Sequence, residues 1–401
     1  MILRQSHIER ITLYYKHNLS KCFYVSVKFT DTCKHFEFAL QNYLTLIDIR
    51  DDVYNKKDYQ YINGKYTVSS NTGFRKLFLK YKIEYEGDIL VLPPDTIFPI
   101  VEDIGYPIQY VLYLFDENNE LYINLPPDKG KKRTFYHLYD LALISENLIG
   151  TLDILMENEN VYLSDHISKL YSNINIKIVS VLQKFAILYK KLTGLTLSVR
   201  IISLKDINIL GVSYPNLIIL NETLLKYPIT MLYTYMIHEL IHQFLGIKIR
   251  FTGSGRWFLL ESITEYLQCV FVKLIGGNSL FDIMLKKCEE LYRSNFDASK
   301  KISISEYNEN NNEREYLGLI CGKGVLVIDM FIEKYGCNEK TLKNIALDLL
   351  NFKDGVTIVD FEGILIKYYG DGVKEFFKKW IYTADIDIGS EFFLLERRKS
   401  V

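Results

Sequence analysis

The segment His238-Glu239-Leu240-Ile241-His242 constrains the fold of this chain more than any other part of the sequence. Histidines four residues apart share one face of an α-helix, where both imidazoles can bind the same zinc ion. The glutamate between them lies beside the open coordination position, where it can deprotonate a water molecule. A helix over this segment would present two metal ligands and a base together. The pattern therefore favours a zinc-dependent hydrolase, and a peptidase is the first interpretation.

A third ligand is expected from Glu261, which ends the run Trp257-Phe258-Leu259-Leu260-Glu261. Two histidines at this spacing also occur by coincidence in amphipathic helices, so the neighbouring residues matter. Apolar residues at helical spacing predict a buried face before a stop at Gly246: Met231, Leu232, Tyr235, Met236, Leu240, Phe244 and Leu245. Glutamate and histidine are costly to bury in such a helix unless they are paired or metal-bound, which favours the zinc site.

The composition bears on which partners and compartment are expected. A net charge of −1 over 401 residues gives no electrostatic case for binding nucleic acid or an acidic membrane. No apolar run reaches the length of a bilayer, and the N-terminus lacks the layout of a secretory signal. The six cysteines include no C-x-x-C pair, so they are expected to be reduced thiols in a cytoplasmic protein.

Two regions of different character are expected, residues 1–152 and residues 153–401. In the first, short alternating runs separated by turn signals predict a β-rich domain. The runs at 110–115 and 121–125 flank a polar turn and predict a hairpin. In the second, apolar spacing predicts a helix over 178–192 that ends at Gly194, strands at 197–202 and 217–220, the motif helix, and a helix through Glu261 to about 274. Further helices are expected near 324–335, 340–350 and 373–381.

These residues resemble the aminopeptidase N and leukotriene hydrolase group of zinc metallopeptidases, the gluzincins. The group's signature is His-Glu-x-x-His, 18 residues and a glutamate, and 18 residues separate His242 from Glu261. Trp257 and the segment 243–246 match the flanking pattern, 211–218 lies where the group carries a Gly-x-Met-Glu-Asn strand, and 323–326 resembles its Tyr-x-Lys-Gly segment. The resemblance implies an α+β fold: a saddle-like β-rich domain over 1–152, then a thermolysin-like, mainly helical catalytic domain with a small sheet over 153–401.

The resemblance also implies one Zn²⁺ per chain, a peptide or protein substrate and a role for each site residue. His238, His242 and Glu261 would hold the metal, and Glu239 would be the general base that later passes its proton to the leaving amine. Glu265 lies one turn after Glu261 and could accept a hydrogen bond from a ligand histidine, although a solvated carboxylate explains it equally well. No oligomeric state is predicted.

Three departures from the family bear on specificity. The glutamate that grips a substrate's free N-terminus is replaced by Ser213, or by Tyr214 if the alignment shifts by one residue. Both could line the edge of the cleft, where an extended substrate adds its backbone to a strand. Cys321 stands where the family carries its oxyanion-stabilising tyrosine, and a thiol is a weaker hydrogen-bond donor than a phenol. Tyr316 therefore becomes the candidate substitute for that tyrosine, with simple packing as the alternative role. The sequence also stops where the family's catalytic domain should end, so its helical C-terminal domain is expected to be absent.

These departures leave two functions open. The first is a zinc metallopeptidase specialised for processing a particular peptide, or an atypical aminopeptidase. The alternative is a catalytically impaired relative that keeps zinc and binds peptides or a protein partner. The intact Glu239 favours the enzyme, because a structural zinc site needs no base.

Overall fold

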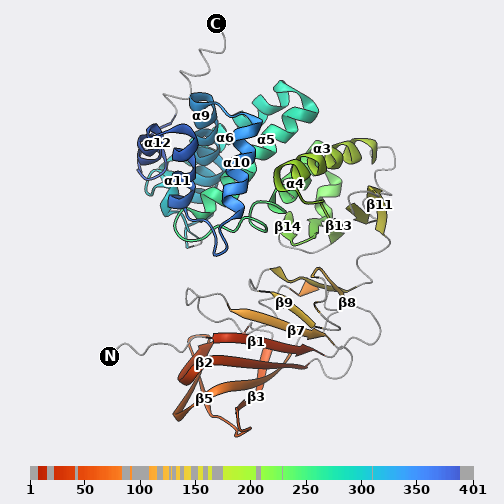
Figure 1. The fold of residues 1–401 in the computed structure, drawn as a ribbon, viewed down its shortest axis with the longest axis vertical. Helices are drawn as coiled ribbons and strands as arrows, with labels where there is room; N and C mark the ends of the chain where they lie inside the picture. The colour runs from red at the N-terminus through yellow and green to blue at the C-terminus, as the bar shows by residue number, and fades with distance from the viewer. Residues whose placement is uncertain are drawn as a thin grey trace. The chain divides into compact units, whose positions relative to one another are not determined.

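The computed structural model describes residues 8–15, 22–40, 44–83, 91–92, 108–114, 121–125, 128, 132–135, 140–145, 152–156, 161–164, 175–204, 209–227, 229–308 and 310–388. The chain divides into two compact units (Figure 1). One comprises Met1–Leu152 with Tyr214–Leu217, and the other comprises Asp153–Ser213 with Ile218–Val401. Each unit is built around a hydrophobic core of its own.

A seven-stranded sheet forms most of the described part of the first unit. Its strands follow the order β3-β5-β2-β1-β7-β9, with β4 paired to β5 outside that path. Their bounds are β1 Ile8–Tyr15, β2 Cys22–Phe38, β3 Leu44–Asp51, β4 Tyr59–Ile62, β5 Lys65–Ile83, β7 Gln109–Leu114 and β9 Lys132–Phe135. Neighbouring strands are antiparallel except β1 and β7, which are parallel. A small sheet has the order β6-β10-β8, with bounds Val91–Leu92, Leu143–Ser145 and Leu121–Ile123.

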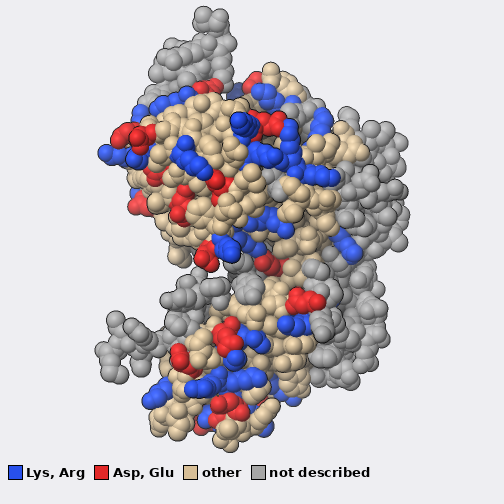
Figure 2. Space-filling model, viewed as in Figure 1, with Lys and Arg blue, Asp and Glu red and all other residues tan. Residues whose placement is uncertain are grey.

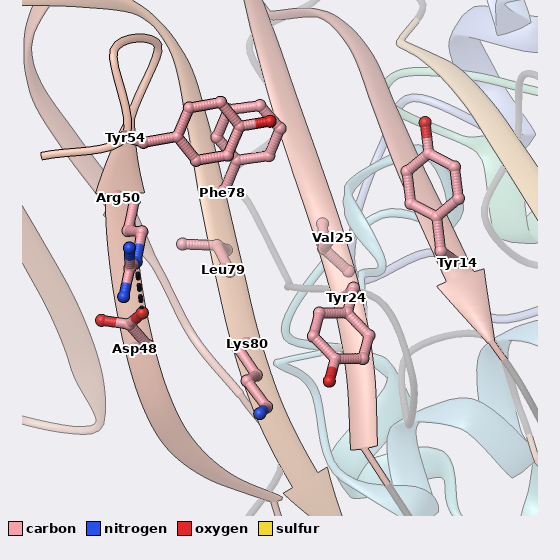
Figure 3. Close-up of a pocket in the computed structure, with 9 residues that line it drawn as sticks. All are labelled: Tyr14, Tyr24, Val25, Asp48, Arg50, Tyr54, Phe78, Leu79 and Lys80. Atoms are coloured by element: carbon pink, nitrogen blue, oxygen red, sulfur yellow. Dashed lines mark hydrogen bonds and ion pairs between the residues drawn. The ribbon is translucent and has the colours of Figure 1, made fainter. Parts of the chain in front are cut away.

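The large sheet has one buried face and one exposed face, because side chains alternate along each strand. The exposed face contains a hollow of about 370 Å³, whose lining includes side chains from β1, β2, β3 and β5 (Figure 3). There the rings of Tyr54 and Phe78 stack with centroids 4.9 Å apart, and Arg50 Nε donates a 2.7 Å hydrogen bond to Asp48. The exposed face is thus covered by side chains that pair with one another.

The hairpin predicted over residues 110–125 is wrong, although both of its strands form. β7 pairs with β1 and β9, whereas β8 pairs with β10 in the small sheet. Alternation identifies a strand and its buried face, but it does not identify the partner strand. Tyr110, Val111 and Leu112 are all buried. They are better buried inside the large sheet than in a two-stranded hairpin, which is marginal in water.

A five-stranded sheet carries the N-terminal part of the second unit. Its order is β11-β12-β13-β15-β14, with bounds Leu152–Met156, Val161–Ser164, Val199–Leu204, Leu217–Asn221 and Gly211–Tyr214. Helices α3 (Asn175–Thr193) and α4 (Ile229–His242) lie beside it (Figure 1) and share its core through Leu182, Ile218 and Leu240. As predicted, α3 is followed by Gly194, which adopts a φ of 74° and whose amide donates to Lys190 O. The strand β14 lies at the sheet's edge, next to which the functional residues gather.

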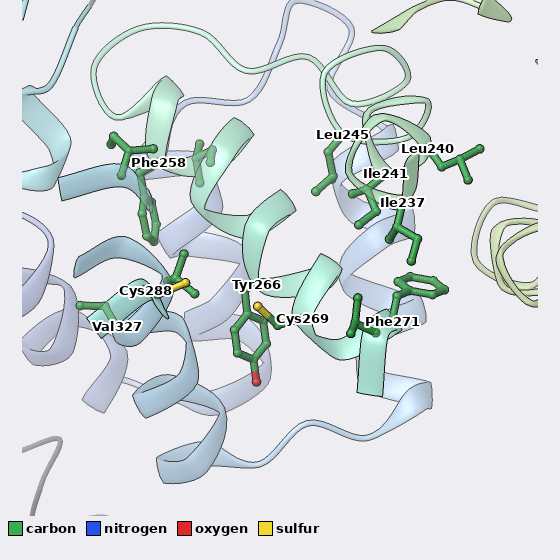
Figure 4. Packing of buried hydrophobic residues seen from close by; sticks show 14 of the residues in the cluster. Ile237, Leu240, Ile241, Leu245, Phe258, Tyr266, Cys269, Phe271, Cys288 and Val327 are labelled. Atoms are coloured by element: carbon green, nitrogen blue, oxygen red, sulfur yellow. The ribbon is translucent and has the colours of Figure 1, made fainter. Parts of the chain in front are cut away.

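Helices dominate the described residues after β15, and η3 precedes α4. Their bounds are η3 Glu222–Lys226, η4 Phe258–Ser262, α5 Ile263–Gly276, α6 Asn278–Ser294, α7 Phe296–Ser299, η5 Ile304–Glu306, α8 Glu313–Glu315, η6 Tyr316–Gly324, α9 Val325–Tyr335, α10 Glu339–Leu350, α11 Ile358–Tyr369 and α12 Gly372–Trp380. The predicted helices near 324–335, 340–350 and 373–381 are α9, α10 and α12, whereas α6 and α11 were not predicted. Figure 4 shows buried side chains of α4, α5, α6 and α9 in the core against which the motif helix packs.

The predicted fold class is confirmed: an α+β chain with a sheet-rich N-terminal part and a mainly helical part that contains a small sheet. Basic and acidic side chains are interspersed on the face of each unit that Figure 2 shows. Every helix in the described residues is too short or too polar to cross a membrane. The six cysteines are free thiols.

Candidate metal centre

The two motif histidines meet because α4 is continuous through them. Apolar side chains at helical spacing, Leu232, Met236 and Leu240 among them, are buried on one side of this helix. His238 and His242 lie one turn apart and are only partly buried, with side chains 14% and 13% exposed. Their Nε2 atoms are 3.0 Å apart. The helix therefore brings two imidazole nitrogens to one point that stays accessible from solvent.

Glu261 completes a triangle of ligand atoms with these histidines. Its Oε2 atom lies 3.5 Å from His238 Nε2 and 3.7 Å from His242 Nε2. One point is therefore equidistant from all three atoms, at about 2.0 Å from each, and this is the length of a zinc–nitrogen or zinc–oxygen bond. Two imidazoles and a carboxylate are also a common donor set of catalytic zinc sites. The residues present thus fit a zinc ion in both geometry and chemistry.

The other ring nitrogens of the histidines have partners that orient the rings. His242 Nδ1 lies 3.2 Å from Leu245 O, to which it can donate a hydrogen bond. This bond places the proton on Nδ1 and leaves the Nε2 lone pair for a metal. His238 Nδ1 faces Glu265 Oε1 at 3.6 Å, longer than a hydrogen bond but within range of a charge contact. Glu265 thus lies beside His238, and its role toward that histidine stays a prediction.

The charges of the cluster are strongly coupled. Burial opposes protonation of His238, but the nearby carboxylates of Glu261, Glu265 and Glu239 outweigh it and raise its pKa to about 9. Burial also opposes ionisation of Glu261, yet His242 and His238 hold its pKa well below the usual range. Burial is the largest cause of the raised pKa of Glu265. The carboxylates around His238 therefore favour positive charge beside them.

Glu239 points from α4 toward the edge strand β14, and it is 5% exposed. Ser213 Oγ donates to Glu239 Oε2 at 2.9 Å and lies 2.6 Å from the backbone oxygen of the same residue. Gly211 lies against the other carboxylate oxygen, because a Cβ there would be 2.7 Å from Glu239 Oε1. Tyr214, the other predicted substrate contact, ends β14 with a side chain that is only 8% exposed.

Tyr316 and Cys321 lie in η6, which is π-helical. In an α-helix, residues five apart point about 140° away from each other, whereas a π-helix bonds residue i to i+5 and brings them to one face. The Tyr316 hydroxyl and the Cys321 thiol accordingly lie close enough to influence each other's pKa. Burial and the charge of Glu261 raise the pKa of Tyr316, so its hydroxyl stays protonated as a donor. The predicted substitute and the residue it would replace thus occupy one face.

Sequence reasoning did not single out two residues that contribute to the site. Gly211 makes room for the Glu239 carboxylate, and the available signal was its place at the head of the segment 211–218, which lies where the resembling family carries its Gly-x-Met-Glu-Asn strand. Tyr235 lies one turn before His238, and burial followed by the charge of Glu265 raises the pKa of its hydroxyl. The sequence had assigned Tyr235 to the apolar face of α4 and to nothing else.

Comparison with solved structures identifies one recurring fold. Yeast leukotriene A4 hydrolase in complex with bestatin superposes with a TM-score of 0.69, covering 95% of this chain and 68% of that chain at 13% identity. Native leukotriene A4 hydrolase from Saccharomyces cerevisiae gives 0.68, covering 96% and 69% at 12% identity. By fold, this chain is similar to leukotriene A4 hydrolase. No family model and no curated protein matches its sequence.

The likeness to leukotriene A4 hydrolase extends over nearly the whole chain, so it includes both the sheet-rich part and the helical part. At 12–13% identity it establishes the fold alone. The fold agrees with the group that the zinc motif resembles. The metal centre rests on the convergence of His238, His242 and Glu261 in this chain.

Proposed function

We propose that this chain is a zinc metallopeptidase that hydrolyses peptide bonds. The observation that carries the proposal is the convergence of three candidate ligand atoms, together with Glu239, a buried glutamate of the helix that carries both histidines. His238 and His242, through Nε2, and Glu261, through Oε2, would hold one zinc ion. When bound, zinc acts as a Lewis acid and makes water acidic enough to react near neutral pH. The geometry supports this role, because the ligand atoms fit the ion and are not fully buried.

Glu239 is the general base in this proposal. Its carboxylate accepts a proton from the attacking water and later delivers that proton to the leaving amine. Tyr316 donates a hydrogen bond from its hydroxyl to the oxygen that becomes negative when the peptide carbon turns tetrahedral, and its raised pKa keeps that hydroxyl protonated. Glu265 orients His238 through the Nδ1 atom of that ring. Tyr214 stays a predicted substrate contact, and its backbone at the end of an edge strand supports that assignment better than its buried side chain.

The substrate is proposed to be a specific peptide or protein, cut without a requirement for a free N-terminus. At the position where the resembling family carries its N-terminus-gripping glutamate, this chain has Ser213, which cannot form an ion pair with an ammonium group. The Ser213 hydroxyl is also directed to Glu239. A free α-amino group of a substrate would therefore gain little binding energy at this position. We propose that the protein is a processing peptidase of the cytoplasm.

The test is hydrolysis of a peptide library that contains both free and acetylated N-termini by the zinc-loaded protein. We expect cleavage of both kinds of peptide, loss of cleavage on chelation, and a rate lowered at least about 100-fold in Glu239→Gln. Glu290→Gln, an exposed glutamate of α6, is the matched control and should cut normally. Full activity of Glu239→Gln would overturn the mechanism. Zinc binding without any cleavage would favour the alternative, a zinc-containing peptide-binding or protein-binding module.

A further inference from the structure

The carboxylate of Glu239 meets two alternate residues of the edge strand β14. Gly211 and Ser213 are two positions apart, so both face the same side of the strand. Oε1 lies against Gly211, where a Cβ would be 2.7 Å away, and Oε2 accepts the 2.9 Å hydrogen bond from Ser213. Each oxygen of the proposed base therefore has its own neighbour on β14, and the carboxylate is held in one orientation.

The Ser213 hydroxyl also donates a hydrogen bond to a backbone carbonyl near the C-terminal end of α4. The last carbonyls of a helix lack amide partners within it. Here the Gln243 amide donates to Leu240 O, and the Glu239 carbonyl lies 2.6 Å from Ser213 Oγ. A hydroxyl has one proton, so it is shared between this carbonyl and the carboxylate of the same residue. Ser213 thus contacts the backbone and the side chain of Glu239 together.

The hydrogen bond from Ser213 matters because the Glu239 carboxylate is buried. A carboxylate that is 5% exposed needs a hydrogen-bond donor, because its ionised form is costly to remove from water. Within the described residues, Ser213 supplies the one side-chain hydrogen bond to it. The bond occupies Oε2, and Oε1 packs against Gly211, where a side chain would collide with the carboxylate.

We propose that Ser213 is a positioning residue for Glu239: its hydroxyl holds Oε2 and so fixes the orientation of the carboxylate that would take the proton of the reacting water. The proposal rests on the proposed peptidase function, and it replaces substrate binding as the role of Ser213. A substrate contact would require the hydroxyl to be free for a ligand, whereas here both of its near neighbours belong to Glu239. Gly211 contributes by admitting the carboxylate to the strand.

The first measurement separates kcat from KM in Ser213→Ala and Ser213→Thr. We expect Ser213→Ala to lower kcat roughly 10- to 100-fold, within the range that a general base contributes, with KM changed less than about threefold. Ser213→Thr keeps the hydroxyl and suits a strand, so it should restore kcat to within about fivefold of wild type. Zinc content should stay at one per chain in both. Ser198→Ala, an exposed serine ahead of β13, is the control.

Three kinetic results would overturn the proposal. Unchanged kcat in Ser213→Ala would show that the hydroxyl does not act through Glu239. A raised KM with normal kcat would return Ser213 to substrate binding. Equal losses in the alanine and threonine variants would indicate a packing effect. If Ser213→Ala lowers the melting temperature but keeps a normal kcat, the role of the hydroxyl would be limited to its structural contact with the Glu239 carbonyl.

A second measurement does not depend on activity. In crystal structures of the zinc-loaded proteins, we expect Glu239 to keep one side-chain conformer in wild type and in Ser213→Thr, and to adopt another in Ser213→Ala. If wild type cuts no peptide but the conformer changes in this way, the proposed function fails and the positioning role stands. An unchanged conformer in Ser213→Ala would overturn the positioning role even in an active enzyme.

Discussion

Ser262 Oγ donates a 2.7 Å hydrogen bond to the backbone oxygen of Ile320. The bond joins η4, which carries Glu261, to η6, which carries Tyr316 and Cys321. Ser262 is fully buried, and Gly324 packs so closely that a Cβ there would lie 2.8 Å from Ser262 Cβ. A small buried contact between two π-helical segments therefore joins the segment of the proposed ligand Glu261 to the segment of the proposed oxyanion donor Tyr316.

Substituting Gly324 by alanine should disturb this contact. The added methyl group must displace Ser262, next to Glu261, and overpacking of this kind typically costs about 1–3 kcal/mol. We expect a lower melting temperature and weaker zinc binding together. Gly363→Ala is the matched control, because this exposed glycine of α11 has open space around it and should gain up to about 1 kcal/mol in helix propensity. Destabilisation without any change in zinc affinity would show that the contact does not support the metal site.

The two carboxylates near the histidines should contribute unequally to zinc affinity. Glu261→Gln removes a charged ligand, so we expect zinc to be lost at concentrations that saturate wild type. Glu265→Gln leaves the ligands in place and removes only the charge beside His238, for which a loss of about 10- to 100-fold in affinity is typical. Competition with a chelator measures both constants. An unchanged affinity in Glu265→Gln would mean that this carboxylate is only a helix residue.

Tyr316→Phe tests the oxyanion donor. Removing one such donor typically costs about 100-fold or more in kcat, so we expect a loss of that order with zinc content unchanged. Tyr335→Phe is the control, since its buried hydroxyl has no hydrogen-bond partner within the described residues and its loss should be neutral or stabilising. If Cys321→Ala reduces kcat by as much and Tyr316→Phe does not, the thiol is the donor and the assignment to Tyr316 is wrong.

The motif helix could be predicted because its signals are local. His238 and His242 are four residues apart inside an apolar repeat, and such spacing specifies both a helix and its face. The same holds for α3, α9, α10 and α12. The division into a strand-rich first region and a more helical second region followed from the change in periodicity along the chain, and the resemblance to the gluzincins implied the α+β fold.

The contacts that shape the site could not be predicted because they join distant residues or depend on rare geometry. Ser213 is 26 residues from Glu239, and nothing in its neighbourhood indicates which helix its hydroxyl meets. The π-helical turn of η6 aligns Tyr316 with Cys321, and single-sequence periodicity has no pattern for such a turn. The pairing of β7 was missed for the same reason, because its partners β1 and β9 are chosen by burial in the whole sheet.

Lys323 should make the stability of the protein depend on pH. Its side chain is 2% exposed, and burial lowers its pKa from 10.5 to about 8, although Asp385 and Asp387 oppose the shift. Below pH 8 the folded protein bears the cost of a buried charge. Between pH 8 and 10.5 only the folded state has lost this proton. The contribution of Lys323 to the free energy of unfolding therefore rises with pH over this range. Its full range is about 3 kcal/mol at most.

Lys323→Met removes the charge and keeps much of the side chain's volume. We therefore expect the variant to be more stable than wild type near pH 7, and we expect this advantage to shrink as the pH approaches 10, because wild type has by then released the proton. Urea unfolding of both proteins at the two pH values measures the difference, with the exposed Lys286→Met as the control for loss of one positive charge. An advantage of equal size at both pH values would mean that Lys323 does not lose its proton in this range in the folded state.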